Sequence, residues 1–118
     1  MSLDRNPNRK TLMVALDIDK KIRNYQSKQI QESQGTYSYS KALNVLLAKG
    51  ISVIRKGDEE KYLFVDKKRV TVMFNPEILK KLKILFGKEI IECANNYCEL
   101  PQMSFSKEVD KQLRKVFR

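Results

Sequence analysis

The stretch TLMVALDI, at residues 11–18, decides the fold of this chain. Large apolar residues occupy every second position along it, and this period of two is typical of a β-strand that has one buried face. The same pattern returns at residues 68–74, KRVTVMF. The apolar faces consist of Leu12, Val14, Leu16 and Ile18 in the first stretch and Val70, Val72 and Phe74 in the second. The sequence therefore predicts two strands, each with one face against a core.

Two predicted helices follow the first strand. A polar, helix-compatible segment begins at Asp19 and ends at Gly35. Ser38 or Ser40 caps a second helix, and Gly50 ends it. Apolar residues cover nearly its whole circumference, so this helix must be buried on every side. They are Ala42, Leu43, Val45, Leu46, Leu47 and Ala48.

A longer helical region follows the second strand. Asn75 is a suitable N-cap, and Pro76 fits the first helical position. We prefer a long helix that crosses Gly87, followed by a last helix that SFSK opens at residues 104–107. The alternative is a short first helix that ends at Gly87, with GKEIIECANNYCEL as the second helix and residues 102–118 as an added one.

The order strand, helix, helix therefore occurs twice. SYSK at residues 38–41 and SFSK at residues 104–107 are 66 positions apart. An alignment of the strands by their last apolar residues, Ile18 and Phe74, gives an offset of 56. The difference indicates that the first helix of the second copy is about ten residues longer than that of the first.

The segment between the copies is predicted to be a hairpin, with ISVIR and KYLFV as its arms and a turn at Lys56, Gly57 and Asp58. The predicted fold is α+β and mostly helical. Its four parts are a flexible basic arm at 1–9, a first strand-helix-helix unit at 10–50, a hairpin-like connector at 51–66 and a second unit at 67–118.

This organisation resembles the ribbon-helix-helix family of DNA-binding proteins, which includes the Arc, MetJ and CopG repressors. The resemblance lies in TLMVALDI, in SYSKALNVLLA, which fits that family's Ser-x-Ser-x-x-Ile-x-x-Ala helix start, and in KKRVTVMFNPEILKKL. It implies that two units pair their strands antiparallel, interlock their helices and insert the two-stranded ribbon into the DNA major groove. The pairing occurs either within one chain, as a pseudo-dimer, or between two chains of a homodimer, and tethering favours the first.

The resemblance also implies which side chains reach the bases. The outward residues of the second strand are Lys67, Arg69, Thr71 and Met73, and those of the first are Thr11, Met13, Ala15 and Asp17. The residues of the second strand can contact base edges well, whereas Asp17 after the first strand would face a polyanion. An asymmetric half-site is therefore expected. The expected base contacts are Lys67, Arg69, Thr71, Thr11 and Met13. The alternative for residues 67–69 is a solvated run of charge at a turn.

Phosphate contacts are expected at the starts of the second helices, where free N–H groups and the helix dipole attract anions. The alternative for these residues is ordinary helix capping, and both roles are compatible. The expected phosphate contacts are Ser38, Ser40, Lys41, Ser104, Ser106 and Lys107, together with Arg9 and Lys10 of the basic arm, which also contains Arg5.

The composition agrees with an acidic partner. The net charge is +10, and the chain has no histidine, which excludes a histidine base, a catalytic triad and a histidine metal site. We therefore expect no enzyme activity, cofactor or metal. Cys93 and Cys98 are expected to be free thiols in a reducing cytoplasm, and no apolar run of about 18 residues predicts a membrane span.

The leading hypothesis is a sequence-specific double-stranded DNA-binding protein that regulates transcription or plasmid copy number or partition. The first alternative is an antitoxin-type interaction protein with a DNA-binding half and a partner-binding half. The second alternative is a non-specific nucleic-acid binder that relies on charge alone.

Overall fold

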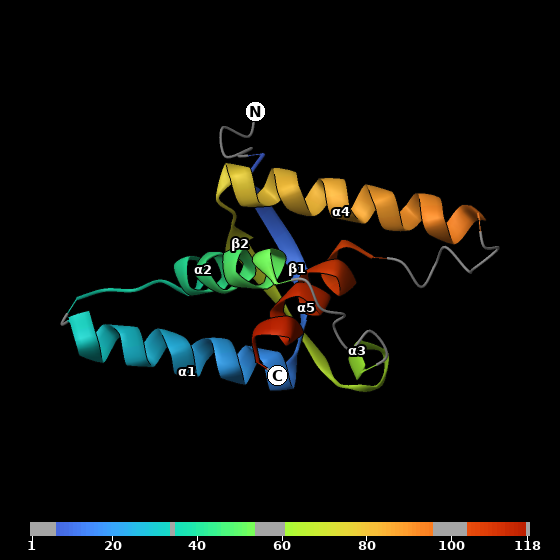
Figure 1. Ribbon diagram of the computed structural model, residues 1–118. Helices are drawn as coiled ribbons and strands as arrows, with labels where there is room; N and C mark the ends of the chain where they lie inside the picture. The colour runs from blue at the N-terminus through green and yellow to red at the C-terminus, as the bar shows by residue number, and fades with distance from the viewer. Residues whose placement is uncertain (1–6, 34, 54–60, 96–103, 118) are drawn as a thin grey trace, which may run out of the picture.

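A computed structural model describes residues 7–33, 35–53, 61–95 and 104–117 (Figure 1). The described fold is α+β and mostly helical, with one two-stranded sheet that crosses the middle of the molecule. Helices α1 and α4 lie on opposite sides of it, and α2 and α5 lie between them (Figure 1). The elements are β1 (Arg9–Ala15), α1 (Leu16–Ser33), α2 (Tyr39–Ser52), α3 (Lys61–Phe64), β2 (Lys67–Met73), α4 (Pro76–Asn95) and α5 (Phe105–Val116).

The expected antiparallel pairing of the two strands is confirmed. β1 pairs with β2 inside the chain, and Arg9 lies opposite Met73 while Ala15 lies opposite Lys67. One face of this ribbon is buried through Leu12, Val14 and Val72, as the alternation predicted. These residues and the apolar faces of the helices form one core. Because both halves of the sequence contribute to it, neither half has a core of its own.

The predicted extension of the first strand to Ile18 is wrong, because the strand ends at Ala15 and α1 starts at Leu16. The Leu16 amide still donates to the Asp66 carbonyl at 2.8 Å, which closes the ladder. From there the buried residues Ile18, Asp19 and Ile22 lie on one side of the helix, whereas a strand would place the neighbours Ile18 and Asp19 on opposite faces. The two aspartates of this first turn suit the positive end of the helix dipole.

The long helix after the second strand is confirmed. α4 is one helix of 20 residues that crosses Gly87, and the Glu77 amide donates to the Asn75 side chain, as expected of an N-cap. The expected difference of about ten residues between the first helices is wrong, because α1 has 18 residues. α4, the first helix after the second strand, has 20 residues.

The predicted hairpin at residues 51–66 is wrong where the structure describes it. α2 continues past Gly50 to Ser52, and residues 61–64 form the helical turn α3. Helix continuation lets Ile51 pack on the core. The turn of α3 places Tyr62 against β1, where its hydroxyl donates to the Met13 carbonyl at 2.8 Å. The expected turn at Lys56, Gly57 and Asp58 lies outside the described residues.

Gly50 marks the place where α2 and α5 approach each other most tightly. A Cβ atom at Gly50 would overlap the backbone carbonyl of Gln112 and would also touch the side chain of Val116. Both helices are central to the core, so neither backbone has free space to retreat. Gly50 is therefore needed for helix packing and not, as the sequence suggested, to end the helix.

We predict that Gly50→Ala lowers the free energy of unfolding by about 1–3 kcal/mol, because the added methyl group meets backbone rather than a movable side chain. Urea unfolding followed by circular dichroism measures this loss. Gly35→Ala is the matched control, since a Cβ there lies 3.8 Å from its nearest atom, the Ser33 carbonyl oxygen. Equal stability of the two variants would contradict the proposed close approach of α2 and α5.

Candidate nucleic-acid interface

The solvent-exposed face of the ribbon presents the same three residue types from both strands. β1 contributes Arg, Thr and Met at alternate positions, and β2 does the same. The Thr11 and Thr71 side chains lie directly opposite each other, with their Oγ1 atoms 3.4 Å apart. Each arginine lies opposite a methionine of the other strand. This exposed face, called the ribbon face below, consists of Arg9, Thr11, Met13, Arg69, Thr71 and Met73.

The register gives the ribbon face an approximate two-fold symmetry about the Thr11–Thr71 pair. The motif RKTLM at residues 9–13 corresponds to RVTVM at residues 69–73, an offset of 60. This repeat is visible in the sequence, but the alignment of Ile18 with Phe74 obscured it, because Ile18 belongs to a helix and not to a strand.

The expected outward set of the first strand requires correction. Thr11 and Met13 are exposed as expected, but Ala15 is completely buried, and Asp17 lies on α1. Arg9, expected in a flexible arm, is part of β1 and of the ribbon face. Lys10 is half-buried and has the parity of the core side of the strand.

Of the second strand's expected base contacts, Arg69 and Thr71 lie on the ribbon face. Lys67 is only half-exposed at the end of the ribbon. Its ammonium group donates to the Val65 carbonyl at 3.0 Å and lies 4.6 Å from the centre of the Tyr62 ring. Lys67 is thus held by the connector, whereas Arg69 is exposed on the ribbon face beside the central Thr11–Thr71 pair.

Two serine hydroxyls join the ribbon to the helices that follow it. Ser40 of α2 accepts a hydrogen bond from the Met73 amide at 3.0 Å. Ser106 of α5 accepts one from the Met13 amide, also at 3.0 Å. α2 therefore begins at β2 and α5 begins at β1, and the two contacts follow the approximate symmetry of the ribbon face.

The other serine of each pair is the N-cap. The Lys41 amide donates to the Ser38 hydroxyl and the Lys107 amide donates to the Ser104 hydroxyl, both at 3.0 Å. The expected helix capping by SYSK and SFSK is confirmed. The structure adds that the first serine of each motif caps its helix, whereas the second accepts a hydrogen bond from a strand amide. Lys41 is exposed and Lys107 is half-buried.

The two helix starts differ in their surroundings. At α2, Asn44 donates to the Met73 carbonyl at 2.9 Å and accepts from the Asn75 amide at 2.8 Å. An open groove of about 580 Å³ lies there, and Ser38, Ser40, Lys41 and Asn44 are among the residues that line it. At the corresponding position of α5 stands Asp110, whose carboxylate accepts a hydrogen bond from Arg114 instead. The Tyr62 hydroxyl donates to the Met13 carbonyl in its place.

A cluster of charge fixes the start of α2. The Tyr39 hydroxyl donates to Asp19 at 2.8 Å, Arg23 donates at 3.0 Å, and the Lys68 ammonium lies 3.5 Å away. Burial raises the pKa of Asp19, but the hydrogen bonds from Tyr39 and Arg23 and the charges of Arg23 and Lys68 outweigh it, so this pKa lies below its usual value. Burial and the Asp19 carboxylate raise the pKa of Tyr39, so its hydroxyl remains a donor at neutral pH.

Asp17 is occupied in a second ionic cluster and not directed at the ribbon face. The Arg114 guanidinium donates to both carboxylate oxygens of Asp17, at 2.8 and 3.1 Å, and to Asp110 at 2.6 Å. This bidentate pair joins α1 of the first copy to α5 of the second. The Asp17 carboxylate expected to oppose a polyanion is therefore paired with Arg114, which it shares with Asp110.

Comparison of the chain with protein-family models, with curated proteins and with solved structures finds no significant match. Among the residues that the structure describes, no helix has the length and apolar character needed to cross a bilayer. Cys98 and the side chain of Cys93 lie outside the described part of the chain.

We predict that Asp19→Asn destabilises the protein by about 1–3 kcal/mol at pH 7, because it removes a charged acceptor from a buried cluster. A carboxyl whose pKa is lowered by folding stabilises the protein above its ordinary pKa of 3.8, and this contribution disappears as the pH falls below that value. The stability difference between wild type and Asp19→Asn should therefore shrink between about pH 5 and pH 2.

Urea unfolding at a series of pH values measures this difference. Glu32→Gln, at an exposed carboxylate of the same helix, is the control for the loss of one negative charge. A gap between wild type and Asp19→Asn that stays constant down to pH 2 would show that Asp19 does not contribute through its charge.

Proposed function

We propose that this chain is a sequence-specific double-stranded DNA-binding protein in which two ribbon-helix-helix units in one chain form a single DNA-binding surface. The observation that carries the proposal is the ribbon face, where an exposed two-stranded ribbon presents Arg-x-Thr-x-Met from each strand. Within the described residues, the packing of the core does not require arginine or threonine at these positions, because the side chains are exposed. In this proposal the protein is a binding protein, most simply a regulator of transcription or of plasmid copy number or partition.

The chemistry of the ribbon face suits the major groove. A two-stranded ribbon fits the width of that groove in B-form DNA. The guanidinium groups of Arg9 and Arg69 can each donate two hydrogen bonds to O6 and N7 of guanine. Thr11 and Thr71 can contact base edges or thymine methyl groups, and the exposed methionines add apolar contact. Because the triplets are related by a local two-fold axis, the preferred site should be an inverted repeat and not the asymmetric site expected from the sequence.

The helix starts can fix the position of the ribbon on the DNA backbone. Ser40 and Ser106 hold the N-termini of α2 and α5 at the two strands of the ribbon. The positive ends of both helix dipoles therefore lie next to the ribbon. Lys41 is exposed at the first of these ends. A net charge of +10 supports attraction to a polyanion at long range.

Selection of bound sequences from random duplex DNA is the experiment that tests the function. We expect enrichment of a short inverted repeat with guanines at symmetric positions. Binding without enrichment in the presence of excess competitor would indicate the non-specific alternative, and no binding at low salt would refute the proposal.

We predict that Arg9→Ala and Arg69→Ala each weaken binding to the selected site by about 1–3 kcal/mol and relax base preference at one of two symmetry-related positions. Fluorescence anisotropy with substituted duplexes measures both effects. Lys28→Ala, at an exposed residue of α1, removes a positive charge outside the ribbon face and is the matched control. If Arg69→Ala relaxed the base preference and Arg9→Ala did not, recognition would be asymmetric, and this result would contradict the two-fold mode.

A second prediction concerns the phosphates. Lys41→Ala should lower the slope of log affinity against log salt concentration by about one unit, because one counterion fewer is released on binding. Lys49→Ala, at the opposite end of the same helix, should leave the slope unchanged. A Lys41→Ala protein with the wild-type slope would leave the start of α2 with only its capping role.

A further inference from the structure

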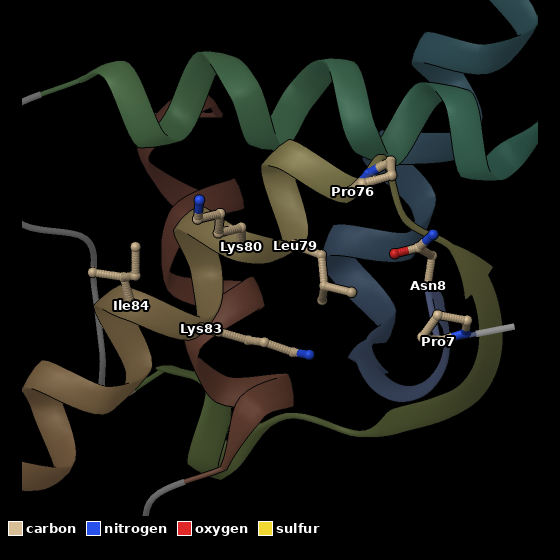
Figure 2. Close-up of a pocket in the computed structure, with 7 residues that line it drawn as sticks. All are labelled: Pro7, Asn8, Pro76, Leu79, Lys80, Lys83 and Ile84. Carbon is tan, nitrogen blue, oxygen red and sulfur yellow. The ribbon is translucent and has the colours of Figure 1, made fainter.

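A groove that contains two lysines lies at the end of the ribbon where β1 begins. Its volume is about 400 Å³, and its walls are the first turns of α4 and the start of the described chain (Figure 2). Figure 2 shows the Lys83 side chain extending from α4 toward Pro7 and Asn8. The groove is called the end groove below. Its lining residues are Pro7, Asn8, Pro76, Leu79, Lys80, Lys83 and Ile84.

The end groove is continuous with the ribbon face. The Phe74 amide donates to the Asn8 carbonyl at 2.8 Å, so the groove begins directly where the paired strands end. Asn8 is followed in the chain by Arg9, which is exposed on the ribbon face. A duplex that lies along the ribbon face and extends past Arg9 therefore reaches the end groove next.

The other end of the ribbon shows what the end groove lacks. Three pairs of residues correspond at the offset of 60: Asp19 and Leu79, Arg23 and Lys83, and Lys68 and Asn8. At the α1 end, Asp19 accepts a hydrogen bond from Arg23 at 3.0 Å and lies 3.5 Å from the Lys68 ammonium. A carboxylate of the chain thus binds both cations there. At the α4 end, the buried Leu79 takes the place of that carboxylate.

The two lysines of the end groove are therefore available to an external anion. Lys80 and Lys83 are exposed, and neither forms an ion pair with another of the residues that the structure describes. At the α1 end, by contrast, Lys67 also donates to a carbonyl of the connector. Of the cations at that end, Lys20, the counterpart of Lys80, is the one that no described group of the chain engages.

The charges around the end groove favour an anion. Residues 76–88 of α4 contain four lysines and one glutamate, Glu77, which is exposed and does not line the groove. Arg9 adds a positive charge on the side of the ribbon face. The next glutamate, Glu89, is six residues beyond the second lysine of the groove, which is about 9 Å along a helix. The charged residues at positions 4 and 5 have opposite signs and lie outside the described part of the chain.

We propose that the end groove binds a backbone phosphate of duplex DNA just outside the inverted repeat that the ribbon face contacts, with Lys80 and Lys83 as the cationic groups. This inference rests on the proposed function and extends it. The sugar-phosphate backbone borders the major groove, so it passes beside a ribbon that lies in that groove. Because the α1 end lacks an equivalent pair of lysines, the contact is made at one end of the site. The protein then uses flanking DNA on one side of a symmetric site.

Duplexes with different flanks test the inference. The selected inverted repeat is prepared without flanks, with about six added base pairs on one side, and with the same addition on both sides. Fluorescence anisotropy measures the affinities at low salt, where exposed ion pairs are strongest. We expect the first flank to raise the affinity about fivefold, a gain in the range of two exposed ion pairs. The second flank should add at most about a factor of two, because it only makes the two orientations on a symmetric site equivalent.

Two double variants identify the groups that cause this gain. Lys80→Ala combined with Lys83→Ala should remove the response to the flank and lower the salt slope on the flanked duplex by about two units. Lys20→Ala combined with Lys28→Ala is the matched control, since it removes the same charge from exposed residues of α1 and should keep the response. Circular dichroism verifies that both variants are folded. A flank with uncharged methylphosphonate linkages should give no gain, which distinguishes a phosphate contact from a base contact.

Equal gains from the first and the second flank would overturn the one-sided contact. A response to the flank that persists in the variant of Lys80 and Lys83 would overturn the assignment to the end groove. Equal affinity for all three duplexes would overturn the inference, whereas specific binding to the unflanked repeat would still support the proposed function. Absence of binding to every duplex would refute both, so the two failures are distinguishable.

Discussion

The antiparallel pairing of β1 with β2 is the constraint on which the rest of this structure depends. A two-stranded ribbon has only one face that it can bury, and here Leu12, Val14 and Val72 bury it against the helices. The opposite face must then remain in solvent. Because the register places Thr11 opposite Thr71, that face carries matching side chains from both strands. The same pairing therefore creates the core and the candidate interface.

The helices extend this constraint by crossing between the two halves of the chain. Ser40 of α2 accepts a hydrogen bond from an amide of β2, Ser106 of α5 accepts one from an amide of β1, and α2 and α5 meet at Gly50. A sheet of two strands is marginally stable alone, so these crossed contacts supply the packing that it lacks. α2 is buried by elements of both halves of the chain through Ala42, Leu43, Leu46 and Leu47. The expected burial on every side is wrong, because Val45 is half-buried and Ala48 is exposed along the open groove.

The symmetry is broken where the two copies are joined. Asn44 provides the donor to the Met73 carbonyl in one half, whereas its counterpart Asp110 accepts a hydrogen bond from Arg114. Tyr62 of α3 supplies the hydrogen bond to the Met13 carbonyl, and Arg114 forms ion pairs with both Asp110 and Asp17. The connector is thus part of the second half's packing. One helix start is left open and the other is covered, although the two strands remain equivalent on their exposed face.

Much of this architecture could be predicted from local patterns. The alternation in TLMVALDI and KRVTVMF, the Ser caps and the Asn75 cap each depend on a few neighbouring residues, because strand period and capping chemistry are local properties. Other features depend on what packs against them, and no local pattern contains that information. They are the position where β1 ends, the role of Gly50 in helix packing and the helical structure of residues 61–64. The strand register is also a tertiary property, since it follows from how both strands fit one core. The sequence by itself therefore determined that the chain has two strands with one buried face each, and where the capped helices begin. Only the tertiary structure decided that Arg9 belongs to the exposed face and that Asp17 does not, because a shift of strand end or register changes which side chains face solvent.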